Sequence, residues 1–432
     1  MDIAKDARFA STKLKILSAD ERSNALLAVR DALAANKDAI LEANKLDLDA
    51  ARQADLPSSL IKRLDLTSPG KYDAMLQGIA DVAALDDPVG KVSLRTTLDD
   101  GLELQRVSCP IGVILVIFEA RPEVIANITA LALKSGNAAI LKGGKESLNS
   151  FTAIADAVTS ALAATKIPAS AIQLVATRAD VASLLDQTDY IDLVIPRGSN
   201  KLVSDIKNST RIPVLGHADG ICSAFVNADA DPEMAAKIVV DAKTNYPAGC
   251  NAIEQLLVHK DAVKTVLPTI ASSLADAGVV IKATPELFEA LKDIVPENLL
   301  KHSEEGDFDC EFLNFTIATT TVGSVEAAIE HINAHSSKHT DVIITASESD
   351  AQRFLNGIDS ASVFWNASSR FADGFRFGFG AEVGISTSKI HSRGPVGLEG
   401  LVIYQYQLKG SGQVAGSYIG AGGSKAFKHI QH

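Results

Sequence analysis

The chain has 432 residues, of which 47% are hydrophobic and 22% are charged. This length predicts two or three domains, and the composition excludes a wholly disordered protein. The net charge of −12 argues against a protein that coats nucleic acid or anionic lipid. Four cysteines without CxxC spacing argue against a disulfide scaffold and against a zinc site. They are Cys109, Cys222, Cys250 and Cys310.

The first residues, MDIAKDARFASTKLK, carry charges throughout and lack an apolar segment with a small-residue cleavage site. We therefore expect no secretory signal. The longest strongly apolar run, residues 111–118, is far shorter than the roughly 20 residues that span a bilayer as a helix. These observations predict a cytoplasmic protein that binds neither a membrane nor nucleic acid.

Residues 2–84 are expected to be helical, because Ala, Leu and Ile recur three and four residues apart among charged residues. Ser18 and Glu21 have the spacing of a capping box, which predicts the start of a helix after Ser18. In residues 91–110, two short runs flank the sequence Asp-Asp-Gly, which is the turn chemistry of a β-hairpin. The chain should therefore pass from helices into a hairpin near residue 91.

Apolar runs then alternate with helix-like segments. The expected strands are IGVILVIF, NAAILKGG, IQLVAT and IDLVIPRG, and the intervening helices include residues 147–164 and 181–185. Uniformly apolar strands separated by helices indicate a parallel sheet that is covered on both faces. We predict a doubly wound, Rossmann-type nucleotide-binding domain in this region.

The alternation begins again after Ile212. The expected strands are ICSAFVN, EQLLVH and DVIITA, and helices are expected at residues 232–243 and 261–277 and in VEAAIEHINAH. This pattern predicts a second α/β domain. A loop rich in Gly and Arg, residues 370–400, then leads into the apolar segment LVIYQYQL. We expect this last strand to pair with the early hairpin and to leave an edge for a partner subunit.

Cys250 lies between a loop that contains Pro and Gly and an expected strand, where its thiol could face a cleft. A thiolate at such a place is a nucleophile, but many cysteines are simply small buried hydrophobic residues. The residue types leave both interpretations open. Cys109, Cys222 and Cys310 lie in or beside apolar runs and are expected to be packing residues.

Two turns that follow expected strands contain groups suited to phosphate. One contains Lys142, Gly143 and Lys145, and the other contains Gly198 and Ser199. Glycine lets the backbone approach a ligand closely, and the start of a helix favours an anion. Each turn taken alone is equally compatible with an ordinary tight or solvated turn. Together, at one edge of a sheet, they indicate a dinucleotide site.

The Gly-rich loop near the carboxyl end carries the arginines Arg370, Arg376 and Arg393. Clustered guanidinium groups in an acidic protein indicate recognition of carboxylate or phosphate, although exposed ion pairs are the alternative for each of them. Histidines at His331, His335 and His339 are spaced four residues apart, but no carboxylate or thiolate completes a ligand set. We expect them to position loops rather than to bind a metal.

Six segments of the chain together resemble one family. They are NYPAGCNAIEQLLVH, ILKGGKES, VIPRGSNKLV, VLGHADGIC, AAIEHINAHSSKHTDVII and NASSRFADGFRFGFGAEVGISTSKIHSRGPVGLEGL. From the first helices to about Tyr404, the chain is similar to the acyl-phosphate reductases of the aldehyde dehydrogenase superfamily. This resemblance implies a Rossmann-type cofactor domain, an α/β catalytic domain and a small β element for oligomerisation.

The resemblance implies NADPH-dependent reduction of L-glutamyl 5-phosphate to L-glutamate 5-semialdehyde and phosphate, the second step of proline biosynthesis from glutamate. By its position in the family pattern, Cys250 is the nucleophile. Its thiolate attacks the acyl phosphate, expels phosphate and forms a thioester, which hydride from the nicotinamide then reduces. Arg121, Arg370, Arg376 and Arg393 are the candidate contacts for substrate or phosphate.

The resemblance also implies which residues surround NADPH. Lys142 lies where the superfamily lysine meets the adenosine ribose. Lys145 lies where NAD-preferring relatives often carry an acid, and a cation there suits the extra phosphate of NADPH. Ser199 matches the pyrophosphate loop, and Glu311 in EFLNF matches the glutamate that contacts the nicotinamide ribose.

Two departures from ordinary aldehyde dehydrogenases inform the expected mechanism. Val214 stands where those enzymes carry the glutamate that activates water, so the thioester should survive until hydride arrives. The segment FEARP at residues 118–122 lacks the asparagine that contributes to the family's oxyanion hole. Arg121 or the backbone amide of Cys250 is expected to take over that stabilisation.

The expected domains are an NADPH-binding domain (residues 1–90 and 109–218), a catalytic domain (219–398) and an oligomerisation element (91–108 and 399–432). Pairing of the exposed strand edges predicts at least a homodimer, and glutamate 5-kinase is a candidate partner. The alternatives are a phosphate-independent aldehyde dehydrogenase, a catalytically quiet partner that channels acyl phosphate from the kinase, and a cysteine hydrolase built on Cys250.

Overall fold

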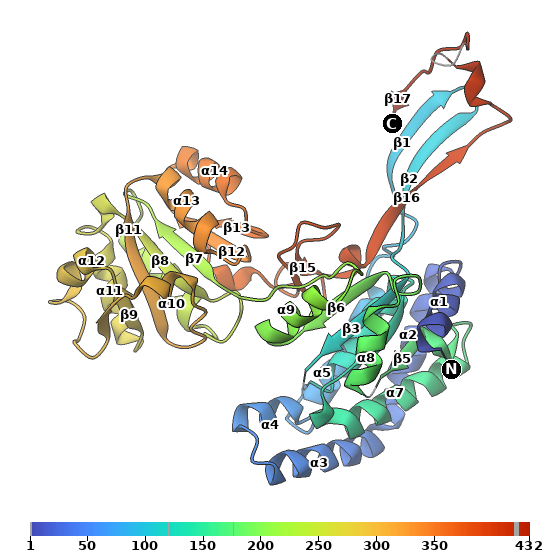
Figure 1. The fold of residues 1–432 in the computed structure, drawn as a ribbon, viewed down its shortest axis with the longest axis horizontal. Coiled ribbons are helices and arrows are strands. Elements are labelled where there is room, and N and C mark those ends of the chain that lie inside the picture. Colours follow the sequence, from blue (N-terminus) through green and yellow to red (C-terminus); the bar gives the residue numbers. More distant parts are fainter. Residues whose placement is uncertain (1, 120, 176, 419–422) are drawn as a thin grey trace.

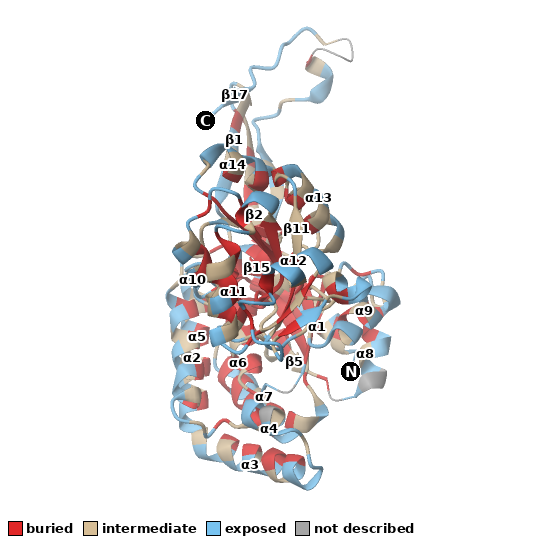
Figure 2. Cartoon of the chain, turned by 90° about the vertical axis from the view of Figure 1, so that its left-hand side faces the viewer, coloured by how far each residue is buried: buried red, intermediate tan, exposed pale blue. Residues whose placement is uncertain are grey.

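The structure is a computed structural model that describes residues 2–119, 121–175, 177–418 and 423–432. Figure 1 shows two α/β lobes side by side and a narrow sheet that projects away from both of them. Buried residues gather in the two central sheets and on the helix faces that cover them (Figure 2). This arrangement agrees with the two α/β domains and the β element that the sequence predicts.

Five helices open the first lobe, as the spacing of apolar residues predicts. The predicted capping box is confirmed, because Ser18 accepts a hydrogen bond from the backbone N–H of Glu21 and the Glu21 side chain accepts one from the N–H of Ser18. The helix after this cap buries Leu26, Val29 and Leu33 in the core of the lobe. The five helices are α1 (Ile3–Leu14), α2 (Ala19–Ala35), α3 (Lys37–Gln53), α4 (Ser58–Leu64) and α5 (Lys71–Ala84).

A four-stranded parallel sheet with the order β5-β4-β3-β6 forms the centre of the first lobe. Its strands, which the apolar runs predict, are β3 (Val113–Phe118), β4 (Ala138–Lys142), β5 (Ile172–Leu174) and β6 (Leu193–Arg197). Its helices are α6 (Val124–Lys134), α7 (Leu148–Ala163), α8 (Arg178–Leu185) and α9 (Asn200–Ser209). The chain passes from β3 outward to β5 and then returns to the other side of β3. The carboxyl ends of β3 and β6 therefore flank the switch point where α/β sheets bind their ligands.

The second lobe is built on a seven-stranded sheet with the order β10-β9-β11-β8-β7-β12-β13. The sequence predicts β7 (Cys222–Val226), β8 (Ile253–His259) and β12 (Thr340–Ile344). Four strands were not predicted, because they are short or rich in threonine and lack a continuous apolar run. These are β9 (Val280–Ala283), β10 (Leu300–His302), β11 (Thr316–Val322) and β13 (Ser362–Trp365).

Helices cover both faces of this sheet. They are α10 (Pro232–Thr244), α11 (Leu267–Asp276), α12 (Pro285–Leu291), α13 (Val325–His335) and α14 (Glu348–Gly357). The predicted start of a helix at residue 261 is wrong, since a short 3-10 turn at Lys260–Ala262 comes first and α11 begins only at Leu267. Pro268 explains this start, because proline is favoured in the first turn of a helix and disrupts its interior.

The projection is an antiparallel sheet with the order β16-β2-β1-β17. The predicted hairpin is confirmed as β1 (Val92–Asp99) and β2 (Leu102–Pro110), with Gly101 at a φ of 67° in the turn. The predicted pairing of the last apolar strand with the hairpin is also confirmed. In this pairing β16 (Val402–Lys409) runs antiparallel to β2, and Tyr404 lies opposite Ser108. The two-residue strand β17 (Ile430–Gln431), which was not predicted, covers the outer edge of β1.

The chain returns to the first lobe before it enters the projection. Val383, Val396, Leu398 and Leu401 are buried in the core of the first lobe, and strands β14 (Gly384–Ser386) and β15 (Gly394–Val396) form a small two-stranded sheet. The last part of the range expected for the catalytic domain therefore packs on the first lobe, because its apolar side chains are buried there. The described part of the second sheet ends earlier, at Trp365.

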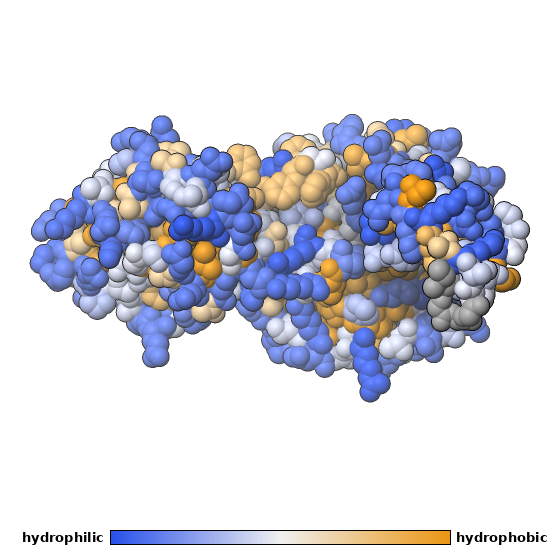
Figure 3. Space-filling view, turned by 90° about the horizontal axis from the view of Figure 1, so that it is seen from above, coloured by the Kyte–Doolittle hydropathy of each residue, from blue (hydrophilic) through white to orange (hydrophobic). Residues whose placement is uncertain are grey.

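The outer surface is mainly polar. In Figure 3, hydrophilic residues cover most of the visible face of both lobes, and apolar residues gather in a hollow of the right-hand lobe. Large apolar side chains are exposed on the projection, among them those of Tyr404, Tyr406 and Leu408. Within the described ranges, no helix combines the length and the apolar character that a membrane crossing requires.

Candidate active site

A cavity of about 570 Å³ opens at the switch point of the first sheet and reaches the second lobe. This volume lies within the range of about 300–1,000 Å³ that is usual for small-molecule sites. Its walls combine the ends of β3 and β6, the crossing segment at residues 215–218 and loops of the second lobe. The lining residues used below are Arg63, Glu119, Arg121, Arg197, Gly198, Ser199, His217, Cys250, Glu311 and Glu382.

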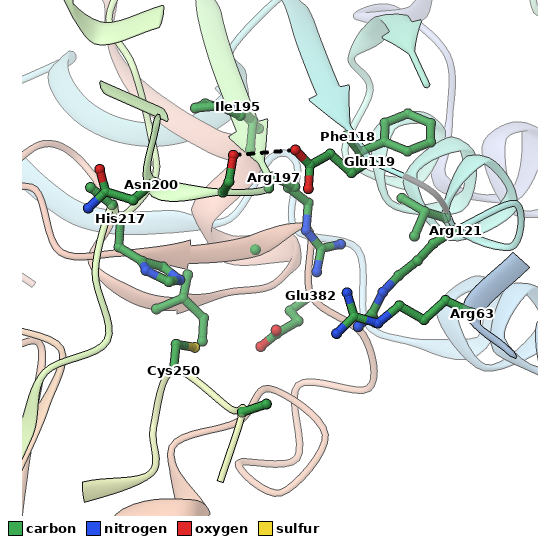
Figure 4. A pocket seen from close by; sticks show the side chains of 18 of the residues that line it. Arg63, Phe118, Glu119, Arg121, Ile195, Arg197, Asn200, His217, Cys250 and Glu382 are labelled. Atoms are coloured by element: carbon green, nitrogen blue, oxygen red, sulfur yellow. Dashed lines mark hydrogen bonds between the residues drawn. The ribbon is translucent and has the colours of Figure 1, made fainter. Parts of the chain in front are cut away.

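Cys250 lies in this cavity, in the loop between α10 and β8. Its backbone is held by a close approach of Gly220. A Cβ atom at Gly220 would lie 2.5 Å from both the Cα and the carbonyl oxygen of Cys250, and 2.6 Å from Oε1 of Glu311. The thiol of Cys222 donates a hydrogen bond of 3.2 Å to the same carbonyl oxygen. The cysteine backbone is therefore fixed from behind, while its side chain faces the cavity (Figure 4).

Burial, together with the nearby carboxylates of Glu382 and Glu311, raises the pKa of the Cys250 thiol to about 12. The guanidinium group of Arg370 acts in the opposite direction. Because only the thiolate is a strong nucleophile, the side chain is a protonated thiol at neutral pH before a ligand enters the cavity. Any chemistry at this cysteine therefore has to include removal of its proton.

Arg370 is held next to the cysteine loop by two hydrogen bonds. The hydroxyl of Ser369 donates to the carbonyl oxygen of Asn251 at 2.6 Å, and the amide of Asn251 donates to the carbonyl oxygen of Ala372 at 2.9 Å. The guanidinium group then lies 5.8 Å from the ring centre of Tyr246. Burial lowers the pKa of Arg370, and its Nε is buried without a partner. This cation is well placed to act on an anion at Cys250.

The other two arginines predicted from the loop have different positions. Arg376 donates a hydrogen bond to the carbonyl oxygen of Arg370 and so supports the loop itself. Arg393 donates to the carbonyl oxygens of Thr387 and Asp359 and forms an ion pair with the Asp359 carboxylate. These contacts hold two loops together. Within the described part of the chain, none of the three loop arginines, Arg370 included, is among the residues that line the cavity.

Three arginines line the cavity from the first lobe. Arg121 was predicted, whereas Arg63 on α4 and Arg197 at the end of β6 were not. In Figure 4, the guanidinium groups of Arg63 and Arg121 point into the same space as Arg197 and the carboxylate of Glu382. Burial lowers the pKa of Arg197, and the charge of Glu382 opposes this shift. The cluster can hold an anion of more than one negative charge. Ala120, within the FEARP segment, lies outside the described residues.

The predicted cofactor residues other than Glu311 lie at the carboxyl edge of the first sheet. Gly198 and Ser199 line the cavity, and Ser199 precedes α9, whose first turn has no side-chain cap. The uncapped N–H groups of such a helix start are suited to bind phosphate. The hydroxyl of Ser199 donates to Glu119 at 3.5 Å (Figure 4).

Lys142 and Lys145 lie at the end of the neighbouring strand β4 and do not line this cavity. Lys142 pairs with Ile117 in the sheet register, and its ammonium group donates to the carbonyl oxygen of Gly143 at 2.6 Å. A side chain at Gly143 would force the Phe151 ring to move, because a Cβ would lie 1.8 Å from that ring. This edge continues from the cavity along the sheet, in the direction that an extended dinucleotide would follow.

Glu311 is placed by hydrogen bonds at both ends of its loop. Its carboxylate accepts a bond of 3.0 Å from the backbone N–H of Gly220. Two residues later, the N–H of Leu313 donates to Glu254 at 3.1 Å, and Glu254 forms a fully buried ion pair with Lys243. Burial raises the pKa of Glu311. The sequence predicts only the role of Glu311 and gives no signal for the pair that holds its loop.

The three regularly spaced histidines do not form one group. His331 and His335 are neighbours, with 4.6 Å between their ring centres. His331 contacts Gln255 and His335 contacts Asp309, both on α13. His339 instead lies near His217, with 5.1 Å between their ring centres. Burial lowers the pKa of His339 to about 3 and also lowers that of His217, so both rings are neutral. One ring nitrogen of each of these two histidines and the sulfur of Cys250 lie within 4.8 Å of one another.

This fold and this cysteine site define a class of enzyme. The chain belongs to the aldehyde dehydrogenase family, whose model matches residues 1–282. It is 56% identical to gamma-glutamyl phosphate reductase of Saccharomyces cerevisiae over 99% of this chain and 96% of that protein. It is 53% identical to a probable gamma-glutamyl phosphate reductase of Schizosaccharomyces pombe over 98% of this chain and 95% of that one.

A solved structure agrees with this assignment. The crystal structure of gamma-glutamyl phosphate reductase from Thermotoga maritima is 39% identical, with a TM-score of 0.91 over 96% of this chain and 99% of that chain. The described architecture is thus that of an aldehyde dehydrogenase-like fold, and the resemblance expected from the six sequence segments is confirmed.

Proposed function

We propose that the protein reduces L-glutamyl 5-phosphate to L-glutamate 5-semialdehyde and phosphate, with NADPH as hydride donor, in proline biosynthesis. The identity of 56% with a gamma-glutamyl phosphate reductase, over nearly the whole of both chains, carries this proposal. The cavity supports it, because a cysteine and a cluster of arginines face one space. Such a site can receive both an acyl carbon and the phosphate attached to it.

In the proposed reaction, the thiolate of Cys250 attacks the acyl carbon, and the proton that the thiol gives up ends on the released phosphate. The bond from that carbon to the phosphate oxygen breaks, phosphate leaves, and a thioester remains on the sulfur. Arg370 favours the thiolate by its charge. Arg63 and Arg121 neutralise the phosphate as negative charge develops on the leaving oxygen. Removal of one such donor typically lowers the rate by roughly a hundredfold or more.

The residues present fit a dinucleotide cofactor. The uncapped start of α9 and the bare backbone at Gly198 offer N–H groups to a pyrophosphate, and Glu311 takes the position next to the ribose of the nicotinamide. Lys142 and Lys145 take the adenosine end, where a cation at Lys145 favours NADPH over NADH. When bound, NADPH supplies the hydride that reduces the thioester.

The segment that carries a water-activating glutamate in ordinary aldehyde dehydrogenases is apolar here. Val214 forms a bridge to Val194 of β6, so this position is fixed by the backbone. A valine cannot remove a proton from water, and the thioester is therefore protected from hydrolysis at that position. This argues for release of product by reduction rather than by hydrolysis.

The decisive experiment runs the reaction in reverse. Purified protein receives pyrroline-5-carboxylate in equilibrium with its semialdehyde, together with NADP⁺, and NADPH absorbance is followed with and without inorganic phosphate. We expect NADPH to form only with phosphate and not at all in Cys250→Ala. Formation without phosphate would instead identify a hydrolytic aldehyde dehydrogenase. A folded protein that binds NADPH without turnover would leave only the role of a binding partner.

The proposal also covers the oligomeric state of the protein, its partner and its location in the cell. The projection exposes Tyr404, Tyr406 and Leu408 on a strand edge, which suits pairing with a second copy. We propose a cytoplasmic homodimer or higher homo-oligomer, with glutamate 5-kinase as a candidate partner because the acyl phosphate is labile. Light scattering tests the first point, since a stable monomer would contradict it.

A further inference from the structure

Three side chains in or behind the wall of the same cavity are arranged so that they could bind a metal ion. Nitrogen atoms of His217 and His339 and the sulfur atom of Cys250 lie within 4.8 Å of one another. For three atoms with these separations, some point lies no farther than about 2.8 Å from each of them. Zinc bonds measure about 2.0–2.1 Å to histidine nitrogen and about 2.3 Å to cysteine sulfur. Shifts of about 0.5–0.8 Å per side chain would therefore bring all three atoms to bonding distance.

Each of the two imidazole rings has a buried nitrogen atom that makes no hydrogen bond and is therefore available to a ligand. His339 is 1% exposed, and its Nε2 is buried without a hydrogen-bond partner, while its Nδ1 contacts the hydroxyl of Thr340 at 2.8 Å. Nδ1 of His217 is also buried and without a partner. A second contact that fixes the ring is the usual support of a metal-binding histidine. Buried polar atoms without partners are rare and call for an explanation.

The three ligands come from separate parts of the chain. His217 lies in the crossing segment between the lobes, Cys250 lies in the loop before β8, and His339 precedes β12. The regular spacing of His331, His335 and His339 is therefore unrelated to this cluster. The sequence holds no cysteine near those histidines, and no metal was expected there. The fold supplies the thiol from a position 89 residues before His339.

We propose that His217, Cys250 and His339 form a binding site for a zinc ion that reversibly inhibits the enzyme. Two neutral imidazoles and one thiolate are a ligand set that zinc prefers, and the open cavity leaves a fourth position to water. Binding replaces the thiol proton by the metal, so one proton is released for each ion bound. The sulfur is then occupied and cannot attack an acyl carbon.

The inhibition rests on the proposed function, whereas the binding does not. The two are therefore tested separately on the full-length protein. Calorimetric titration with Zn²⁺, in buffers of different ionisation enthalpy, gives the affinity and the number of protons released. Titration with Co²⁺ gives a spectroscopic signature, since a thiolate ligand adds a near-ultraviolet charge-transfer band. Assays of NADPH formation with Zn²⁺, followed by addition of a chelator, then measure inhibition and its reversal.

The variants are Cys250→Ser, His217→Ala and His339→Gln, with His335→Ala as the matched control on a histidine outside the cluster. Loss of partners around a metal typically weakens binding by roughly 10–100-fold, so removal of a ligand should cost at least about tenfold. We expect this loss in the three cluster variants and no change in the control. We also expect the unsubstituted protein to release one proton for each zinc ion bound. In Cys250→Ser, the cobalt charge-transfer band should be lost.

His217 is half-buried at the cavity wall, so His217→Ala keeps the test decisive if His339→Gln fails to fold. Three results would overturn the proposal: no saturable zinc binding, binding that Cys250→Ser leaves unchanged, or binding that both histidine variants leave unchanged. An enzyme that turns over as proposed but binds no zinc refutes only the metal site. A protein that binds zinc as expected but shows no phosphate-dependent reaction refutes only the proposed function.

Discussion

The close contact between Gly220 and the cysteine loop allows a direct test of whether this contact positions Cys250. In Gly220→Ala, the new Cβ would lie 2.5 Å from the Cα and the carbonyl oxygen of Cys250, and 2.6 Å from Oε1 of Glu311. An ordinary contact of this kind begins near 3.4 Å. The cysteine backbone would therefore have to move by about 0.9 Å, because two of the three obstructing atoms belong to the main chain.

The expected effect on catalysis is much larger than the effect on folding. A displacement of about 1 Å of a reacting group typically costs roughly a hundredfold in rate, or about 2.7 kcal/mol of transition-state stabilisation. Added volume in a packed region costs typically about 1–3 kcal/mol of stability, which leaves a protein of this size folded. The N–H of Gly220 also donates to Glu311, so the variant should weaken cofactor binding as well.

The assay is kcat/KM for phosphate-dependent NADPH formation, with near-ultraviolet circular dichroism to confirm the fold. Gly323→Ala is the matched control, because a Cβ at Gly323 meets no atom within 4 Å. We expect a loss of about a hundredfold in Gly220→Ala and no loss in the control. If the two variants have equal activity, the close approach does not position Cys250 and the reasoning fails.

Three further predictions follow from contacts near the site. Because burial raises the pKa of Cys250 to about 12, alkylation of this residue by iodoacetamide should become roughly tenfold faster per pH unit between pH 7 and 10; a rate that mass spectrometry finds independent of pH would contradict this. Arg370→Gln should lower kcat/KM by about a hundredfold and slow alkylation at fixed pH, since its charge favours the thiolate; unchanged rates of both reactions would show that this charge is not used. Gly143→Ala should lower stability in urea by about 1–3 kcal/mol, because its Cβ would lie 1.8 Å from the Phe151 ring, and Phe151→Leu in the same chain should restore part of the loss; a variant as stable as the wild type would refute the assigned contact.

The sequence predicts features that depend on neighbours along the chain. The buried strands β3, β4 and β6 follow from uninterrupted apolar runs, and the helix start at Ser18 follows from two residues three positions apart. Cys250 as candidate nucleophile and Ser199 as candidate cofactor residue are predicted because each lies inside a contiguous motif. In these cases the physical cause of the structure is local.

Features that depend on distant parts of the chain give no such signal. Arg63 lines the cavity from a short helix whose sequence is typical of an exposed surface helix. His339 contacts His217 because the fold brings their distant segments together. Arg393 shows the opposite case. Its residue type and its place in a Gly-rich loop predict a contact with a bound anion. In the fold, however, Arg393 forms an ion pair with Asp359. Residue type predicts what a side chain can bind, and topology determines which partner it meets.

The projecting sheet also has a consequence for how the chain is made. β2 ends at Pro110, and its partner β16 begins nearly 300 residues later, at Val402. At a synthesis rate of about 5–20 residues per second, the hairpin leaves the ribosome roughly 15–60 seconds before its neighbour exists. During this interval both edges of the hairpin present unpaired backbone groups, which other chains can capture. Neighbouring ribosomes on one message would then hold many such edges close together, so the strand that completes the fold is also the one that ends its exposure to wrong partners.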